Sequence, residues 1–205
     1  MLTKIRYGNT NTFLIAGDKG SMLVDTDYAG TLPAFYKTIK GLGIKVSDIT
    51  YVLATHYHPD HVGLVSELMG QGVTLVAMES QLGSVHYSDE IFGREPHLGY
   101  KPIDESKAYV LYFEKSREFL SKIGIQGEII PTGSHSEDSV SVLLDDGTFI
   151  VGDLEPYEYL EAYEDNNSLK ADWDTLLVRN PKRILYAHAN AKVIEDDERY
   201  VYGCF

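Results

Sequence analysis

The segment His56-Tyr57-His58-Pro59-Asp60-His61 carries four potential metal ligands within six residues, directly after an apolar run. Imidazole nitrogen and carboxylate oxygen are ligands that zinc and other first-row divalent metals accept. Side chains of this kind, held this closely without an ion, repel one another and compete for water. A divalent cation relieves both costs, so the segment predicts a metal site.

The backbone conformation decides how these ligands are grouped. On a helix, His56 and His58 point to nearly opposite sides, whereas on an extended backbone they share a face. Pro59 disfavours the helical conformation for the residue before it, so we expect His58 to be extended. His56 and His58 then converge on one point, and Asp60 and His61, at the turn into a helix, reach a second point nearby.

Further ligands must come from elsewhere in the chain, which has seven histidines. His135 lies in a polar turn before a predicted strand, and His188 and Asp153 each lie at the end of an apolar run. Loops at strand ends present functional side chains from a rigid scaffold, so these three residues are candidate ligands. His86 and His97 fit no ligand motif, and we expect them to be loop residues.

The elements that must position these residues alternate between strand and helix. Apolar spacing and turn residues predict strands at 13–16, 22–24, 49–54, 73–77, 140–144, 148–151 and 183–187, and helices at 32–42, 61–69, 107–123 and from an N-cap at Ser168 to residue 178. The polar segment 79–106 gives no clear pattern. Such alternation predicts an α/β domain with helices packed on sheet, and no linker divides the chain, so we expect one domain over residues 1–205.

Composition narrows the possible partners. With 43% hydrophobic and 24% charged residues, the chain is typical of a globular protein. Its net charge of −13 disfavours nucleic acid or an anionic membrane as the main partner, so we expect a small-molecule substrate. Because the first residues lack the pattern of a signal peptide and Cys204 is the only cysteine, we expect a cytoplasmic location and no intrachain disulfide.

The order His-x-His-x-Asp-His followed by His, Asp and His resembles the metallo-β-lactamase fold superfamily, which includes glyoxalase II-like thioesterases, lactonases, phosphodiesterases and tRNA-processing nucleases. The resemblance extends from the hairpin at 11–25 to His188. It implies a four-layer αββα sandwich, an α+β variant of the α/β class, with a dinuclear site at one edge. One ion would be held by His56, His58 and His135, and the other by Asp60, His61 and His188.

Two aspartates complete the implied site. Asp153 would bridge the two ions. Asp25 matches an early aspartate of the family that usually orients the ligands, although an aspartate at the end of a strand can also simply cap the backbone.

The resemblance implies a metal-dependent hydrolase. Two ions about 3.5–4 Å apart can share a water, lower its pKa towards neutrality and polarise a carbonyl or phosphoryl oxygen. The resulting hydroxide would attack an ester, thioester, lactone or phosphodiester bond. Asp60 would act catalytically as well as being a ligand, because its carboxylate can orient this water. Zinc is the expected metal, and iron or manganese also suits these ligands.

Departures from the family pattern leave other functions open. The stretch Gly133-Ser134-His135-Ser136-Glu137-Asp138 replaces the usual Gly-His-Thr-x-Gly-Ser, with an extra residue before the histidine and Asp138 in place of glycine. The best-known zinc β-lactamases lack an acid like Asp153, so we do not expect antibiotic hydrolysis. The alternatives are an iron redox enzyme of the same fold, either persulfide dioxygenase-like or diiron, and a non-catalytic metal-binding sensor. His58 stands where the flavodiiron proteins have glutamate, which weighs against that group.

The substrate is the least predictable feature. The segments 79–106 and 155–167 are expected to border the cleft, and they supply several Tyr, His and Arg side chains, including Tyr87. The substrate-binding candidates are Tyr57, Arg94, Tyr157 and Tyr159. An arginine could hold an anionic group and the tyrosines an acyl or ring group, but such side chains are also common on exposed loops.

Overall fold

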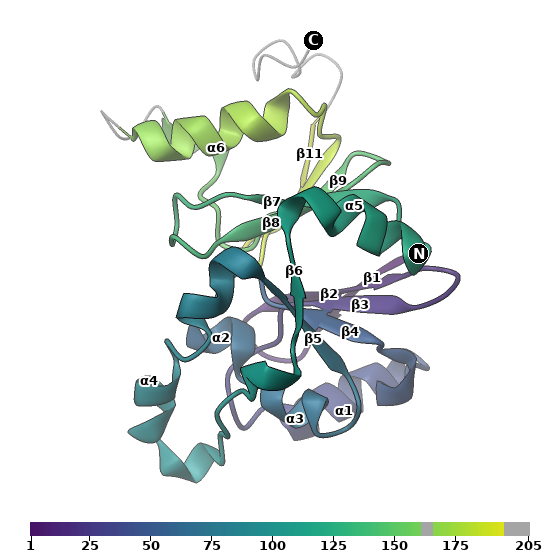
Figure 1. Ribbon diagram of the computed structural model, residues 1–205, viewed down its shortest axis with the longest axis vertical. Coiled ribbons are helices and arrows are strands. Elements are labelled where there is room, and N and C mark those ends of the chain that lie inside the picture. Colours follow the sequence, from purple (N-terminus) through teal and green to yellow (C-terminus); the bar gives the residue numbers. More distant parts are fainter. Residues whose placement is uncertain (161–165, 195–205) are drawn as a thin grey trace.

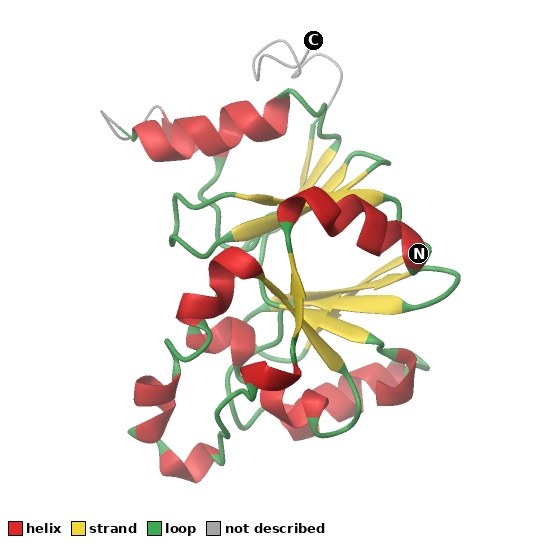
Figure 2. Ribbon diagram, in the orientation of Figure 1, coloured by secondary structure: helices red, strands yellow, loops and turns green. Residues whose placement is uncertain are grey.

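Two β-sheets lie between layers of helices in the computed structural model, which describes residues 1–160 and 166–194 (Figures 1 and 2). The first sheet is antiparallel through its first three strands and parallel thereafter. In spatial order it contains β1 (Leu2–Arg6), β2 (Asn11–Ala16), β3 (Ser21–Val24), β4 (Tyr51–Leu53), β5 (Thr74–Met78) and β6 (Tyr109–Leu111). The second sheet contains β11 (Lys192–Val193), β10 (Arg183–Leu185), β9 (Thr148–Ile150), β8 (Val140–Leu144) and β7 (Gly127–Pro131).

Alternation along the strands divides the buried side chains among three clusters. In β3, Leu23 faces one side of the first sheet, whereas Met22 and Val24 face the second sheet. In β10, Leu185 joins the cluster between the sheets and Ile184 faces the outer side. These clusters fill a helix–sheet, a sheet–sheet and a sheet–helix interface, so the predicted four-layer αββα sandwich is confirmed.

The helices cover the sheets in a way that matches these clusters. Phe35 of α1 packs beneath the first sheet, Trp173 of α6 packs on the outer face of the second, and Phe119 of α5 packs into the cluster between them. None of the helices that the structure describes has the length and apolar character needed to cross a membrane. The α-helices are α1 (Leu32–Gly41), α2 (Pro59–Val62), α3 (Val65–Met69), α4 (Asp89–Gly93), α5 (Phe113–Lys122) and α6 (Asn167–Leu177).

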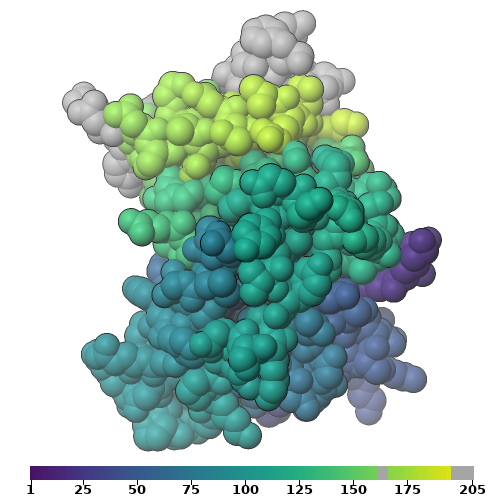
Figure 3. Space-filling view, in the orientation of Figure 1, coloured from purple at the N-terminus to yellow at the C-terminus, as the bar shows by residue number. Residues whose placement is uncertain are grey.

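The helix predicted over residues 107–123 is wrong in its first part. Residues Tyr109–Leu111 form the edge strand β6, which pairs in parallel with β5, and the chain remains extended at Tyr112 before α5 begins. The Tyr-Val-Leu sequence suits a strand, and the open edge of β5 supplies the pairing that favours it. The teal segment that contains α4, β6 and α5 covers much of the face shown in Figure 3.

The helix predicted over residues 61–69 is two short helices, α2 and α3. The chain bends at Gly63, where a Cβ atom would lie 2.2 Å from the backbone nitrogen of Ala29. Glycine therefore allows the α2–α3 junction to touch the loop after β3, which also carries Asp25. This contact fixes the end of α2, and with it His61, against the loop after β3.

Smaller differences concern element ends and short elements. The N-cap of α6 is Asn166 rather than Ser168, because the Asn166 side chain accepts the Leu169 backbone N–H at 3.2 Å. The strands β1, β7 and β11 were not predicted, and Cys204 lies outside the described residues. Most of the segment 79–106 folds into short helices. The 3₁₀ helices are η1 (Val46–Asp48), η2 (Glu79–Ser84), η3 (Pro96–Leu98), η4 (Glu105–Lys107) and η5 (Tyr157–Leu160).

Candidate metal centre

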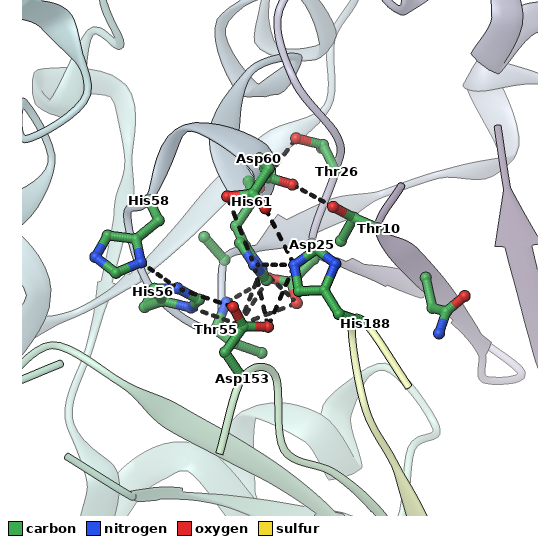
Figure 4. Close-up of polar contacts among 12 residues, drawn as sticks. Thr10, Asp25, Thr26, Thr55, His56, His58, Asp60, His61, Asp153 and His188 are labelled. Atoms are coloured by element: carbon green, nitrogen blue, oxygen red, sulfur yellow. Dashed lines mark hydrogen bonds and ion pairs between the residues drawn. The ribbon is translucent and has the colours of Figure 1, made fainter. Parts of the chain in front are cut away.

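All the predicted ligands meet at one edge of the sandwich, where strands of both sheets end. Figure 4 labels each of them except His135. The chain leaves β4 into His56 and His58, leaves β9 into Asp153, and leaves β10 into His188. Backbone hydrogen bonds join the sheets here: Val140 N–H donates to Thr55 at 2.8 Å, and Asn11 N–H donates to Ala187 at 2.7 Å. The ligands therefore come from a rigid frame.

The first ligand group contains three histidines. The Nε2 atom of His56 lies 2.9 Å from Nδ1 of His58, and Nε2 of His135 lies 3.2 Å from the same atom. His58 is extended, with φ −69° and ψ 153°, as Pro59 predicted. The extended backbone places His56 and His58 on one face.

The second ligand group contains Asp60, His61 and His188. Nε2 of His188 lies 3.1 Å from Oδ2 of Asp60 and 3.3 Å from Nε2 of His61. Asp60 and His61 are in α2, whose first turn begins directly after His58. The change from extended chain to helix at Pro59 thus separates the two groups.

Asp153 lies between the two groups, as Figure 4 shows for its carboxylate between His56 and His188. Its Oδ2 atom is 3.9 Å from Nε2 of His56 and 3.8 Å from Nε2 of His135. Its Oδ1 atom is 3.4 Å from Nε2 of both His61 and His188. One carboxylate therefore presents one oxygen to each group.

The chemistry of these donors fits divalent cations. Oδ1 of Asp153 is buried and accepts no hydrogen bond from any residue that the structure describes. The pairs His56–His58 and His61–His188 bring imidazole nitrogens, which can act as metal ligands, to 2.9 and 3.3 Å from each other. A cation between such donors removes the repulsion and satisfies the buried oxygen.

The charges around the site are consistent with ligation. Burial lowers the pKa of His56, and neighbouring histidines lower it further, so this ring is neutral and keeps its lone pair. A hydrogen bond from His188 lowers the pKa of Asp60 to about 2. Burial by itself would lower the pKa of His61, but Asp25 and Asp153 outweigh it and raise the value to about 10. Without an ion, a proton on His61 balances the carboxylates.

A family model described as the metallo-beta-lactamase superfamily matches residues 5–188. The chain belongs to this superfamily. The match includes every residue of both ligand groups and Asp153. Members of this superfamily are mostly metal-dependent hydrolases, and the histidine and aspartate clusters of this chain could hold metal ions.

Individual relatives are distant from this metallo-beta-lactamase superfamily member. A Trichophyton rubrum protein called lactamase-like protein nscB is 28% identical over 138 residues, which are 67% of this chain and 35% of that protein. The beta-lactamase-like protein 2 homolog of Drosophila melanogaster is 25% identical over 187 residues, with 91% and 60% covered. The chain thus spans from about a third to 60% of the length of these relatives.

Solved structures show the same fold. The BLEG-1 B3 metallo-beta-lactamase superposes with a TM-score of 0.67 at 19% identity, covering 94% of each chain. A metallo-beta-lactamase family protein from Thermus thermophilus gives a TM-score of 0.63 at 18% identity, covering 98% of this chain and 77% of its own. At such identities the likeness establishes the fold alone.

Asp25 connects the metal centre of this superfamily member to the first sheet. Its Oδ2 atom is 3.2 Å from Nδ1 of His61, and its Oδ1 atom accepts the Thr55 backbone N–H at 2.6 Å. Asp25 is buried with φ 62°, a left-handed conformation that is costly for this residue type. Asp25 therefore makes both of the contacts that the sequence left as alternatives, one with a predicted ligand and one with the backbone.

Thr55 was not predicted as part of the site. Its hydroxyl lies 2.9 and 3.0 Å from the two carboxylate oxygens of Asp25 and 3.2 Å from Nδ1 of His56. Gly152, just before Asp153, packs on the other side of Thr55: a Cβ atom there would lie 2.5 Å from the hydroxyl, and φ is +59°. A glycine immediately before a predicted ligand was the available signal for this close approach.

Asn11 and Thr10 hold the second ligand group from β2 and the residue before it. The Asn11 amide donates to the backbone oxygens of Tyr186 at 2.9 Å and Ala189 at 3.0 Å, on either side of His188. The Thr10 hydroxyl donates to the Asp60 backbone oxygen at 2.7 Å. Nothing in their local sequence indicates these contacts.

Asp138, the departure from the family motif, joins the two segments of the first ligand group. Its Oδ2 atom accepts the Tyr57 backbone N–H at 2.8 Å, and its Oδ1 atom accepts the Ser136 hydroxyl at 2.8 Å. The Gln81 amide donates to the Asp138 backbone oxygen at 3.0 Å and to Ala54 at 3.1 Å. The unusual residue therefore has a positioning contact with the His56–His58 segment.

Three of the four predicted substrate-binding residues differ in their exposure and in the side chains that they contact. Tyr57 is only 1% exposed and packs in the core beneath the first sheet, so it does not line an open cleft. Arg94 follows α4, is exposed and pairs with Glu90. Tyr157 packs edge-on against Trp173, with ring centroids 5.7 Å apart.

Two exposed tyrosines flank the centre. Tyr159 is 46% exposed and lines a surface hollow beside the ligands, with a volume of about 340 Å³. Tyr87 is 58% exposed, and its ring centroid lies 5.3 Å from that of His58. The hollow is lined by His135, Gly152, Asp153, Leu154, Glu155, Pro156, Tyr159, Tyr186, His188 and Ala189.

Proposed function

We propose that this protein is a hydrolase that depends on two divalent metal ions. His56, His58 and His135 would hold one ion, and Asp60, His61 and His188 the other. The observation that carries the proposal is the position of Asp153, which directs one carboxylate oxygen to each group. Zinc suits these nitrogen and oxygen ligands best, and iron or manganese is the alternative.

The residues of the chain support water-dependent chemistry. When bound, a pair of divalent ions lowers the pKa of water and polarises a carbonyl or phosphoryl oxygen. Asp60 is ionised at neutral pH, and its carboxylate can accept a hydrogen bond from a water and orient it. The Thr10 hydroxyl holds the Asp60 backbone oxygen in place. The Asp25 carboxylate accepts a hydrogen bond from Nδ1–H of His61, which leaves Nε2 of that ring facing the site.

The substrate side of the centre is the hollow beside His135 and His188. These two ligands are the more exposed ones, so a bound molecule reaches the centre from their side. Tyr159 can pack against an acyl or ring group of a small molecule. The bonds that suit this chemistry are esters, thioesters, lactones and phosphodiesters, and the names of the lactamase-like relatives support cleavage at an acyl group.

The test combines metal analysis with a panel of thioesters, lactones, esters and phosphodiesters. We expect two equivalents of zinc per chain and hydrolysis that is lost in His58→Ala but retained in His97→Ala, which changes an exposed histidine outside both ligand groups. A single iron with oxygen consumption would instead support the redox alternative. Metal binding without turnover of any substrate would support a sensor, and full activity in metal-free protein would exclude both metal-dependent enzymes.

A further inference from the structure

The hollow beside the metal centre has an acidic wall. The segment that follows Asp153 forms this wall, and Glu155 is half-buried within it. Glu155 and the ligand His135 both line this hollow. A negative charge therefore lies beside the path from the hollow to the first ligand group.

No lysine or arginine lines this hollow among the residues that the structure describes. Lys192 pairs with Glu158 of the turn η5 at 3.5 Å. A substrate with a fixed negative group would thus meet Glu155 without a compensating cation.

The remaining wall is apolar and rigid. Leu154 and Pro156 flank Glu155, and Tyr159 adds an exposed aromatic face. Trp173 supports this wall from below, because its indole N–H donates to the Glu155 backbone oxygen at 2.9 Å. Such a surface can bind an uncharged acyl or aryl group by burying its apolar area.

We infer that the site selects substrates that carry no negative charge beside the cleaved bond, and that Glu155 is the residue that excludes the anionic ones. This inference rests on the proposed hydrolase function and adds a substrate class to it. Bound ions would attract the reacting oxygen at the ligand atoms, whereas a group that extends from that oxygen into the hollow would pass Glu155 on its wall. Two like charges at the edge of such a hollow reduce binding by about fivefold or more.

A matched pair of esters tests the selectivity. The two esters are 4-carbamoylphenyl butyrate, which carries a neutral amide, and 4-carboxyphenyl butyrate, which carries a carboxylate of the same shape in the same position. With metal-loaded protein we expect kcat/KM to be about fivefold or more higher for the amide. Glu155→Gln should narrow this ratio and Glu155→Lys should invert it. Glu114→Lys, an equal change of charge at an exposed position in α5, should leave it unchanged.

Binding gives a second readout that does not need turnover. Trp173 is the only tryptophan, so its fluorescence reports on the wall of the hollow. The non-hydrolysable anilides 4-butyramidobenzamide and 4-butyramidobenzoate should bind metal-free and metal-loaded protein with the same preference for the amide, and the preference should follow the Glu155 variants.

The outcomes separate the two proposals. Hydrolysis of both esters at equal kcat/KM, or a preference for the carboxylate that Glu155→Gln does not alter, would overturn the inference and leave the hydrolase proposal standing. Fluorescence discrimination without turnover of any ester, thioester or phosphodiester would contradict the hydrolase proposal and support the charge selectivity. No binding of either anilide would show that the hollow is not a ligand site. Glu155→Gln preserves shape, so it decides the result if Glu155→Lys does not fold.

Discussion

The Asp138 carboxylate accepts the backbone N–H of Tyr57 at 2.8 Å, across 81 positions of the sequence. Tyr57 stands between His56 and His58, and Asp138 stands three residues after His135, so this one hydrogen bond fixes the two segments of the first ligand group relative to each other. A carboxylate here performs a task that the glycine of the usual family motif cannot perform.

Replacing Asp138 should therefore weaken the first ligand group. We expect Asp138→Ala to lower metal affinity by about 10- to 100-fold, as for other residues that orient ligands. Asp138→Asn should retain part of the affinity, because its one carbonyl oxygen can still accept the Tyr57 N–H. Competition with a chromogenic chelator measures both. The exposed neighbour Glu137→Ala is the control, and equal affinities in all three variants would contradict a positioning role.

Asp25→Asn should impair the second ligand group without disrupting the fold. Asparagine tolerates the left-handed conformation of this position. However, an amide NH₂ in place of Oδ2 cannot accept the proton on Nδ1 of His61, so the ring would carry its proton on Nε2, which faces the ligands. We expect the affinity of the second ligand group for metal to decrease by about 10- to 100-fold. The variant should therefore retain about one ion fewer per chain than the wild type after dialysis. Asp18→Asn, exposed in the turn between β2 and β3, should retain full metal content.

Gly152→Ala should destabilise the chain by about 1–3 kcal/mol and reduce metal binding. The positive φ strains any side chain, and the new methyl group would collide with the Thr55 hydroxyl. Gly133→Ala is the matched control, because its methyl group would find no atom closer than 3.7 Å. Urea unfolding of both variants measures the difference. Similar stabilities would show that Thr55 can move away at little cost.

His86 gives a pH-dependent prediction away from the metal centre. Its Nδ1 atom is 2.8 Å from Asp89 and its Nε2 atom 2.9 Å from Glu105, and the hydrogen bond with Asp89 is the main reason that the pKa of His86 is raised. Tyr100 also donates to Asp89. A raised pKa in the folded chain means that the stabilisation is fully present below about pH 6.5 and is lost as the pH rises through the folded value.

The difference in unfolding free energy between wild type and His86→Gln should therefore be larger at pH 5.5 than at pH 8.5. Urea titrations at the two pH values measure it, and subtraction of the variant removes the contribution of the ligand histidines. His97→Gln, at an exposed position of η3, should show no such change. A difference independent of pH would mean that His86 stabilises only by packing.

Metal removal should lower stability as well as activity. An ion that binds only the folded chain adds about 2.7 kcal/mol per site when its free concentration is about 100 times its Kd. We expect chelation to lower the Tm and added zinc to restore it, and we expect this shift to be reduced in His56→Ala. An unchanged Tm on chelation would contradict ligation by this cluster.

The ligands themselves were predictable because the sequence places them in local signals. The closely spaced histidines after β4, the conformational effect of Pro59 and the positions of Asp153 and His188 after apolar strands are all visible within a few residues. The structure brings every one of these predicted ligands together. The alternation of strands and helices likewise predicted helices packed on sheet, and the family resemblance implied the two-sheet sandwich that is confirmed.

The supporting residues could not be found in this way. Asn11 contacts the Tyr186 backbone across 175 positions, and Gln81 reaches Asp138 across 57, so their roles depend on the tertiary arrangement. The error over residues 107–123 has the same origin, because β6 exists only where the edge of β5 is available. Tyr57 was predicted at the cleft from its place in the motif, but alternation of the extended backbone turns it into the core.

The order of the ligands along the chain sets the order in which they become available during synthesis. The group of His56, His58 and His135 is complete once the loop after β7 has been made, whereas the other group waits for His188 after β10. At about 5–20 residues per second, several seconds separate the two events on the ribosome. All three histidines of the first group are therefore synthesised before the second group can form.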